Sequence, residues 1–123
     1  MNANISSHVY DPIEDVILRT HPPVIRTRKA ASGTGELGKG LIVAENSSEE
    51  IIPYDPDGGA PADKPVGVLV RNCSLDHEDI ARYMVHGSVR RSKLIVGESG
   101  PDADDIRLLE DLGIWPESDP MND

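Results

Sequence analysis

Aromatic residues are scarce in this 123-residue chain, which contains no phenylalanine, one tryptophan and three tyrosines. A buried core must therefore be built from valine, isoleucine and leucine. Hydrophobic residues make up 37% of the chain, below the usual share of a compact domain. The length accommodates one domain and not two. We expect one small core with non-globular ends.

Cysteine is also scarce, and long apolar runs and a leader-like start are lacking. Cys73 is the sole cysteine, which excludes an intrachain disulfide and fits synthesis in a reducing cytosol. No apolar run approaches the roughly 20 residues of a membrane-spanning helix. Residues 1–10 lack the basic start and apolar stretch of a secretion signal. The sequence predicts a soluble protein that is made inside the cell.

Basic residues are outnumbered: 12 lysines and arginines stand against 22 aspartates and glutamates, for a net charge of −10. This balance disfavours sequence-independent nucleic-acid binding, because such binding depends on neutralising phosphates with lysine and arginine. It equally disfavours docking on an anionic membrane. We therefore expect neither nucleic acid nor a membrane as a direct partner.

Signatures of catalysis and of cofactor binding are missing. The glycine-rich residues 32–40 precede a predicted strand, whereas a phosphate-binding loop requires Gly-Lys-Ser/Thr leading into a helix. Asp55 and Asp57 resemble the start of a calcium loop, but the spaced ligands and closing glutamate are absent. Cys73 lies near His77 without a motif that marks an activated nucleophile. The sequence predicts no catalytic residues and no cofactor.

A short acidic run with two histidines is the remaining candidate for metal chemistry. Asp76, His77, Glu78 and Asp79 are consecutive, so their side chains point apart and do not all converge on one ion. A metal-dependent enzyme that uses Asp76, His77, Glu78 and His86 is the least favoured of three functions that we weigh. We expect a solvated link and no metal.

Runs rich in valine and isoleucine, bounded by proline, glycine and polar turns, predict the strands of a β core. Alternation in residues 66–70 makes both faces apolar, which is typical of a buried strand. The core is centred on residues 64–96. The predicted strands are residues 24–30, 41–44, 66–70, 84–89 and 94–96.

One helix is predicted near the end of the chain, over residues 102–112. Aspartates at its start suit the positive end of the helix dipole. Ile106, Leu109 and Leu112 follow at helical spacing, and Gly113 is placed to end the helix. We expect Trp115 to pin the following turn onto the core.

The first 31 residues are predicted to be an extended N-terminal arm. Prolines at positions 12, 22 and 23 interrupt regular structure, although Ile13, Val16 and Ile17 have the spacing of one amphipathic helical turn. Residues 24–29, Val-Ile-Arg-Thr-Arg-Lys, read as a basic edge strand that suits an acidic partner surface. We divide the chain into an arm (1–31), a β-rich domain (32–116) and a C-terminal tail (117–123).

Four short motifs, in this order and spacing, resemble a known family. They are LGKGLIV at residues 37–43, PVGVL at 65–69, MVHGSV at 84–89 and LLEDLGI at 108–114. The chain resembles the bacteriophage head decoration (capsid cement) proteins of the lambda protein D-like type over residues 24–116. A longer N-terminal extension and the helix-plus-tryptophan end depart from that pattern.

The resemblance implies a mainly β fold: a small β-barrel or β-tulip-like domain with one C-terminal helix and an extended N-terminal arm. It implies a non-enzymatic structural protein of the virion, made in the bacterial cytoplasm and bound as a homotrimer outside the expanded icosahedral head. The arm is implied to add to the sheet of the phage major capsid protein and so stabilise the head.

Residue assignments follow from this hypothesis. Strand addition uses main-chain hydrogen bonds and leaves side chains to select the partner, so the basic strand is the candidate capsid-binding arm: Val24, Ile25, Arg26, Thr27, Arg28 and Lys29. Trimer contacts are predicted at His86, Ile114 and Trp115. The alternative function is a cytosolic β-barrel module that binds a protein or a small ligand.

Overall fold

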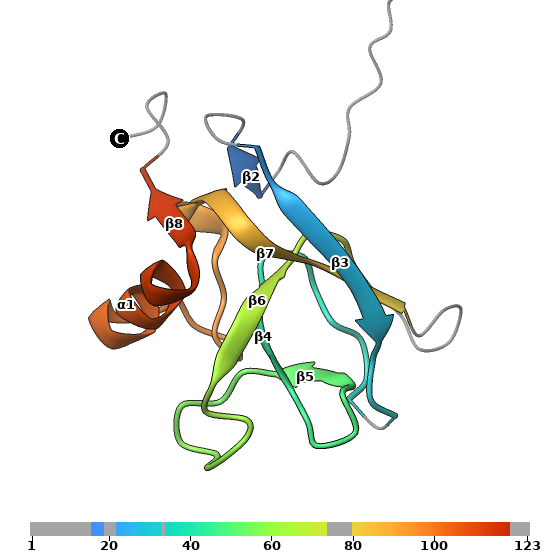
Figure 1. Ribbon diagram of the computed structural model, residues 1–123. Helices are drawn as coiled ribbons and strands as arrows, with labels where there is room; N and C mark the ends of the chain where they lie inside the picture. Colours follow the sequence, from blue (N-terminus) through green and yellow to red (C-terminus); the bar gives the residue numbers. More distant parts are fainter. Residues whose placement is uncertain (1–15, 19–21, 33, 74–79, 119–123) are drawn as a thin grey trace, which may run out of the picture.

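The computed structural model describes residues 16–18, 22–32, 34–73 and 80–118. Within these residues the chain forms a mainly β structure with one C-terminal α-helix, which confirms the fold class expected from the sequence (Figure 1). The described strands make one seven-stranded sheet, and this sheet is not closed.

The elements follow one another in a simple order along the chain. The strands are β2 (Ile17–Leu18), β3 (Val24–Lys29), β4 (Ile42–Glu45), β5 (Ile51–Pro53), β6 (Pro65–Leu69), β7 (Ile80–Arg90) and β8 (Ile114–Glu117). A short 3-10 helix, η2 (Arg91–Lys93), follows β7, and the α-helix α1 (Ala103–Leu112) precedes β8. No helix in the described part of the chain is long and apolar enough to cross a membrane.

The 11-residue strand β7 holds the sheet together, because four other strands pair with it (Figure 1). Its first part pairs antiparallel with β3 and β6. Its last part pairs antiparallel with β2 and parallel with β8. From β6 the sheet continues through β4 to β5. Segments from both ends of the described chain therefore meet on one central strand.

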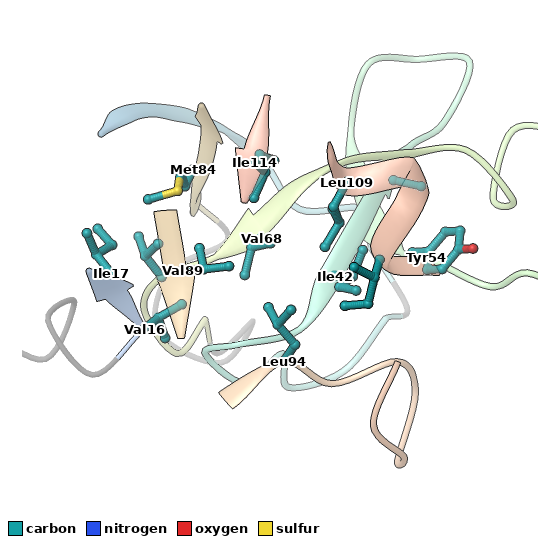
Figure 2. Packing of buried hydrophobic residues seen from close by; sticks show 13 residues of the cluster. Val16, Ile17, Ile42, Tyr54, Val68, Met84, Val89, Leu94, Leu109 and Ile114 are labelled. Carbon is teal, nitrogen blue, oxygen red and sulfur yellow. The ribbon is translucent and has the colours of Figure 1, made fainter. Parts of the chain in front are cut away.

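The two faces of the sheet bury two separate clusters, since side chains alternate along each strand. In β4, Ile42 and Ala44 join one cluster, whereas Val43 joins the other. Figure 2 shows the first, here called the helix-side core: Val16, Ile17, Ile42, Ala44, Tyr54, Val68, Val70, Met84, Val89, Leu94, Ile106, Leu109 and Ile114. The second, the inner core, comprises Ala30, Leu37, Leu41, Val43, Ile51, Leu69, Cys73, Ala81 and Tyr83.

The structure places much of the expected arm inside the folded domain. Val16 and Ile17 are each only 1% exposed in the helix-side core, and Ala30 is fully buried in the inner core. Ile17 and Leu18 form a strand on β7 rather than the helical turn that the spacing of Ile13, Val16 and Ile17 allowed, because pairing with β7 satisfies their backbone groups. The part of the arm before Val16 lies outside the described residues, so an arm remains a prediction for residues 1–15.

Most predicted strands are present, with bounds that tertiary pairing changes. The expected strands at residues 24–30, 41–44, 66–70 and 84–89 correspond to β3, β4, β6 and β7. Residues 94–96 form only isolated bridges, from Ile95 to Leu41 and from Val96 to Ser99. Strands β5 and β8 were not expected, since each is short and contains a proline. Proline is tolerated where a strand pairs on one side only.

The helix agrees closely with its prediction. Asp102 caps its first turn, and a reciprocal pair of hydrogen bonds joins the Asp102 and Asp105 side chains to each other's backbone N–H groups. Gly113 ends the helix in the left-handed conformation at φ 92°. These signals act over neighbouring residues, so local sequence was sufficient to locate this element.

Tyr54, which follows β5, ties that part of the sheet to the start of α1. Its hydroxyl donates a buried 2.7 Å hydrogen bond to Oδ1 of Asp105. Burial, together with this bond to Asp105, raises the pKa of Tyr54 above its ordinary value of 10.0. The folded chain therefore keeps the phenol protonated to a higher pH than the unfolded chain does.

We expect the stabilising effect of the Tyr54 hydroxyl to decrease at alkaline pH. Below pH 10.0 both states are protonated, and Tyr54→Phe should lower the free energy of unfolding by about 1 kcal/mol through loss of the bond. As pH rises past the unfolded pKa, ionisation favours the unfolded wild type alone, so the difference between the two proteins should shrink. Urea denaturation at about pH 7 and about pH 10.5 measures it. A difference that stays constant with pH would contradict this assignment.

Candidate protein-interaction surface

Positive charge is concentrated on two paired strands and the turn after them. β3 carries three basic residues, β7 two and η2 two, which together are seven of the chain's 12 lysines and arginines. These elements contain none of the 22 acidic residues. Every one of the seven is at least partly exposed. We call this set the basic ribbon: Arg26, Arg28, Lys29, Arg82, Arg90, Arg91 and Lys93.

Strand β3 gives the basic ribbon one sheet edge. It pairs with β7 along its length, and in the described part of the chain no other strand forms a ladder with it. A single parallel bridge joins Ala30, just after β3, to Ile51 of β5, and the Ala31 N–H donates to the Ile51 carbonyl at 2.9 Å. The unclosed part of the sheet therefore lies between the body of β3 and the β4–β5 hairpin.

An open hollow of about 330 Å³ adjoins this gap. Alternation places Arg26 and Arg28 on the same face of β3. The hollow, which we call the β3 hollow, is lined by residues of β3, β4, β6, β7 and α1: Arg26, Arg28, Glu45, Val66, Tyr83, Val85 and Leu112. It thus combines two guanidinium groups and a carboxylate with an apolar surface.

Arg28 crosses the gap and forms two ion pairs within the chain. Its Nε lies 3.1 Å from Oε2 of Glu45, and one terminal nitrogen lies 3.1 Å from Oε1 of Glu49. A hydrogen bond with the Tyr83 side chain, aided by the charge of Glu45, raises the pKa of Arg28. Arg28 therefore connects β3 to the β4–β5 hairpin, and its charge is balanced by two carboxylates.

Arg26 differs from Arg28 in this respect. It lines the same hollow from an exposed position and makes no ion pair with the residues that the structure describes. Val66, Val85 and Leu112 supply the apolar part of the lining, and Leu112 is 43% exposed. The hollow therefore offers, beside an exposed hydrophobic surface, one guanidinium that no carboxylate of the described residues pairs with.

The three residues predicted at a trimer contact differ in how far they are exposed to solvent. Ile114 is fully buried in the helix-side core, because it faces inward at the start of β8 (Figure 2). It therefore has no exposed surface to present to another copy. His86 and Trp115 are partly exposed on neighbouring strands, and their rings meet edge to face at 5.1 Å between centroids. A trimer contact at these two rings stays a prediction.

The other sequence candidates do not form a chemical centre in the described structure. Asp76, His77 and Glu78 lie outside the described residues, so the acidic link is not placed. His86 packs on Trp115, and Cys73 is buried in the inner core. Among the described residues no three histidine, cysteine or carboxylate groups are arranged to hold a metal ion.

Sequence reasoning identified the basic strand but missed the hollow beside it. Arg26 and Arg28 were expected to contact a partner, whereas no partner contact was predicted for the other lining residues, Glu45, Val66, Tyr83, Val85 and Leu112. The alternation of β3 and β7 indicates which residues share a face. It does not indicate that β7 lies next to β3, because some 50 residues separate the two strands.

Comparison with known proteins adds a limited similarity. No family model matches the chain. Over 82 residues, 66% of the chain, it is 29% identical to plant UBX domain-containing protein 8 of Arabidopsis thaliana. The matched region covers 14% of that protein, so the chain spans a small part of this relative's length.

Proposed function

We propose that the chain is a non-enzymatic capsid decoration protein that binds as a trimer outside an expanded bacteriophage head and stabilises it. The observation that supports this most is the basic ribbon along the edge strand β3, in a chain whose net charge is −10. The four motifs that resemble the head decoration proteins supply the identity of the partner, the major capsid protein.

The basic ribbon suits docking on a protein surface that carries negative charge. Elsewhere the chain carries 22 acidic residues and five basic ones, so such a partner is repelled except at the ribbon. A sheet edge adds main-chain hydrogen bonds to this electrostatic attraction. Charge thus selects the docking face, and the edge strand provides directional bonds.

In a trimer, three weak contacts with the head together give stable binding. Ordering a flexible arm costs about 1–2 kcal/mol of backbone entropy for each residue, so one arm binds weakly. Three arms on a single trimer bind together, because the first contact raises the effective concentration of the others. The same geometry lets one trimer hold neighbouring capsomers together.

The structure changes which truncation tests the arm. Removal of residues 1–31 would delete β2 and β3 together with buried Val16, Ile17 and Ala30. Such a variant would lose its core, and loss of binding would then carry no information about the arm. Removal of residues 1–15 leaves every described element in place, so that deletion separates arm function from folding.

We expect reversal of two ribbon charges to weaken binding to expanded heads. Arg91→Glu combined with Lys93→Glu changes exposed residues of η2, and the apparent affinity should fall about tenfold or more at low salt. Cosedimentation with purified expanded heads, at several salt concentrations, measures this. Arg107→Glu, an exposed reversal on α1 outside the ribbon, is the matched control and should bind like the wild type.

Three outcomes distinguish the proposals. If no protein binds heads, the decoration function is wrong. If the double reversal binds as tightly as Arg107→Glu, the ribbon is not the docking face. If residues 1–15 are dispensable for binding, the arm mechanism fails while the ribbon stands.

A second function is supported by the β3 hollow. A site of about 330 Å³ with charged and apolar lining also fits a module that binds a protein or a small ligand. The limited similarity to a UBX domain-containing protein is compatible with a protein-binding role of this kind. Native mass spectrometry of purified protein separates the two functions, since a retained ligand favours the module and a bare trimer favours decoration.

A further inference from the structure

We propose that the β3 hollow binds an aspartate or glutamate side chain of an extended segment in the protein partner, and that Arg26 selects it. This inference deepens the proposed function and rests on it, because it assumes a protein partner along β3. It assigns to one residue a recognition role that the motif resemblance does not supply.

The two arginines of the hollow differ in the ion pairs that they form within the chain. Arg28 already contacts Glu45 and Glu49 at 3.1 Å each, so its charge is balanced within the chain and attracts a further carboxylate less than an unpaired guanidinium does. Arg26 has no such contact with the described residues, and its guanidinium offers paired N–H donors that match a carboxylate. An incoming acidic side chain is therefore directed to Arg26.

The surroundings of Arg26 favour a carboxylate that arrives on an apolar strand. Val66, Val85 and Leu112 lie in the same hollow, and Leu112 remains 43% exposed. An occupant that covers these residues removes water from the ion pair and strengthens it. A volume of about 330 Å³ lies at the low end for ligand sites, which suits one or two side chains rather than a large cofactor.

Strand geometry specifies the pattern of the occupant. On a segment paired with β3, every second side chain points to the same face of the sheet. Arg26 and Arg28 mark the face of β3 that borders the hollow. We therefore expect a segment in which an acidic residue and an aliphatic residue stand two positions apart.

A defined peptide tests this recognition directly with the full chain. The probe is a capped hexapeptide, acetyl-Val-Thr-Glu-Thr-Val-Thr-amide, in which one glutamate stands two positions from each of two valines on the same face of an extended strand. Its glutamine counterpart preserves shape and removes charge. Titration of isotope-labelled protein, followed by backbone amide shifts, should show changes at Arg26, Tyr83 and Val85 with the glutamate peptide. The glutamine peptide should bind about tenfold more weakly or not at all.

Matched variants assign the effect to Arg26. Arg26→Gln should weaken the glutamate peptide about tenfold and remove the preference over glutamine, whereas Arg107→Gln should change neither. Unchanged thermal unfolding of Arg26→Gln verifies that the exposed substitution leaves the fold intact. Equal binding of both peptides, unaltered binding to Arg26→Gln, or shifts confined to residues outside the hollow would each overturn the proposal.

The same proteins keep this inference separate from the proposed function. If heads bind the wild type and Arg26→Gln equally, and neither peptide is preferred, the decoration function is supported and the role of Arg26 is wrong. If the protein prefers the glutamate peptide but does not bind heads, the decoration function is wrong and carboxylate recognition by Arg26 is supported.

Discussion

Gly40→Ala is expected to lower the free energy of unfolding by about 4 kcal/mol or more, which is enough to unfold many small domains. A Cβ at this position would lie 2.1 Å from the backbone carbonyl oxygen of Lys93. Gly40 also has φ +92°, a conformation that residues with a side chain rarely adopt. The substitution therefore combines backbone strain with an overlap against main-chain atoms.

Relaxation around Gly40 is restricted from both sides. Its N–H donates to the Leu69 carbonyl at 2.7 Å, and its own carbonyl accepts from the Ile95 N–H at 2.9 Å. These bonds join the turn to β6 and to the segment after η2. A shift that relieved the overlap would break them and uncover the inner core, because Leu41 follows directly.

Gly35→Ala is the matched control for the contribution of the overlap. Gly35 also has a positive φ, +73°, but a Cβ there would meet no heavy atom within 4 Å. Only the conformational cost remains, about 1–2 kcal/mol. Circular dichroism and urea denaturation compare the two variants. Similar losses at both positions would mean that the close approach at Lys93 does not matter.

Leu109→Ala is expected to lower the free energy of unfolding by about 3 kcal/mol. Leu109 is fully buried in the helix-side core, where it packs from α1 among side chains of the sheet (Figure 2). Truncation removes buried apolar surface and leaves a cavity that the surrounding strands fill only in part. Urea denaturation with an unchanged slope would show that stability alone is affected.

Leu108→Ala provides the comparison within the same helix. Leu108 is 39% exposed on the outer side of α1, so its truncation should cost less than about 1 kcal/mol. Both substitutions change helix propensity by the same amount, and the difference between them therefore measures burial. If Leu108→Ala were the more destabilising, the orientation of α1 described above would be wrong.

The interaction surface could be predicted only in part. The basic character of residues 24–29 was evident, and their position at an edge follows from a strand with no fully apolar face. The sequence did not show that these residues belong to the folded sheet rather than to a free arm. Their pairing with β7 depends on main-chain hydrogen bonds, which no residue pattern reports. Ile114 was misjudged for a related reason: a hydrophobic residue next to Trp115 reads equally well as core or as contact.

Local signals were sufficient wherever neighbouring residues carry the interaction. Asp102, Asp105 and Gly113 determine where α1 begins and ends, because capping bonds join residues no more than a few positions apart. The mainly β class followed in the same way from short runs of valine and isoleucine. The excess of acidic residues and the basic strand were likewise properties of the sequence alone.

Only the tertiary structure decided what lies beside β3. Two contacts join segments that are distant along the chain: the bridge from Ala30 to Ile51 and the ion pair from Arg28 to Glu45. No local sequence pattern encodes such contacts. They leave Arg26 in a hollow completed by β6, β7 and α1. Sequence periodicity determines which face a residue occupies, whereas the neighbour across the sheet is selected by the packing of the whole chain.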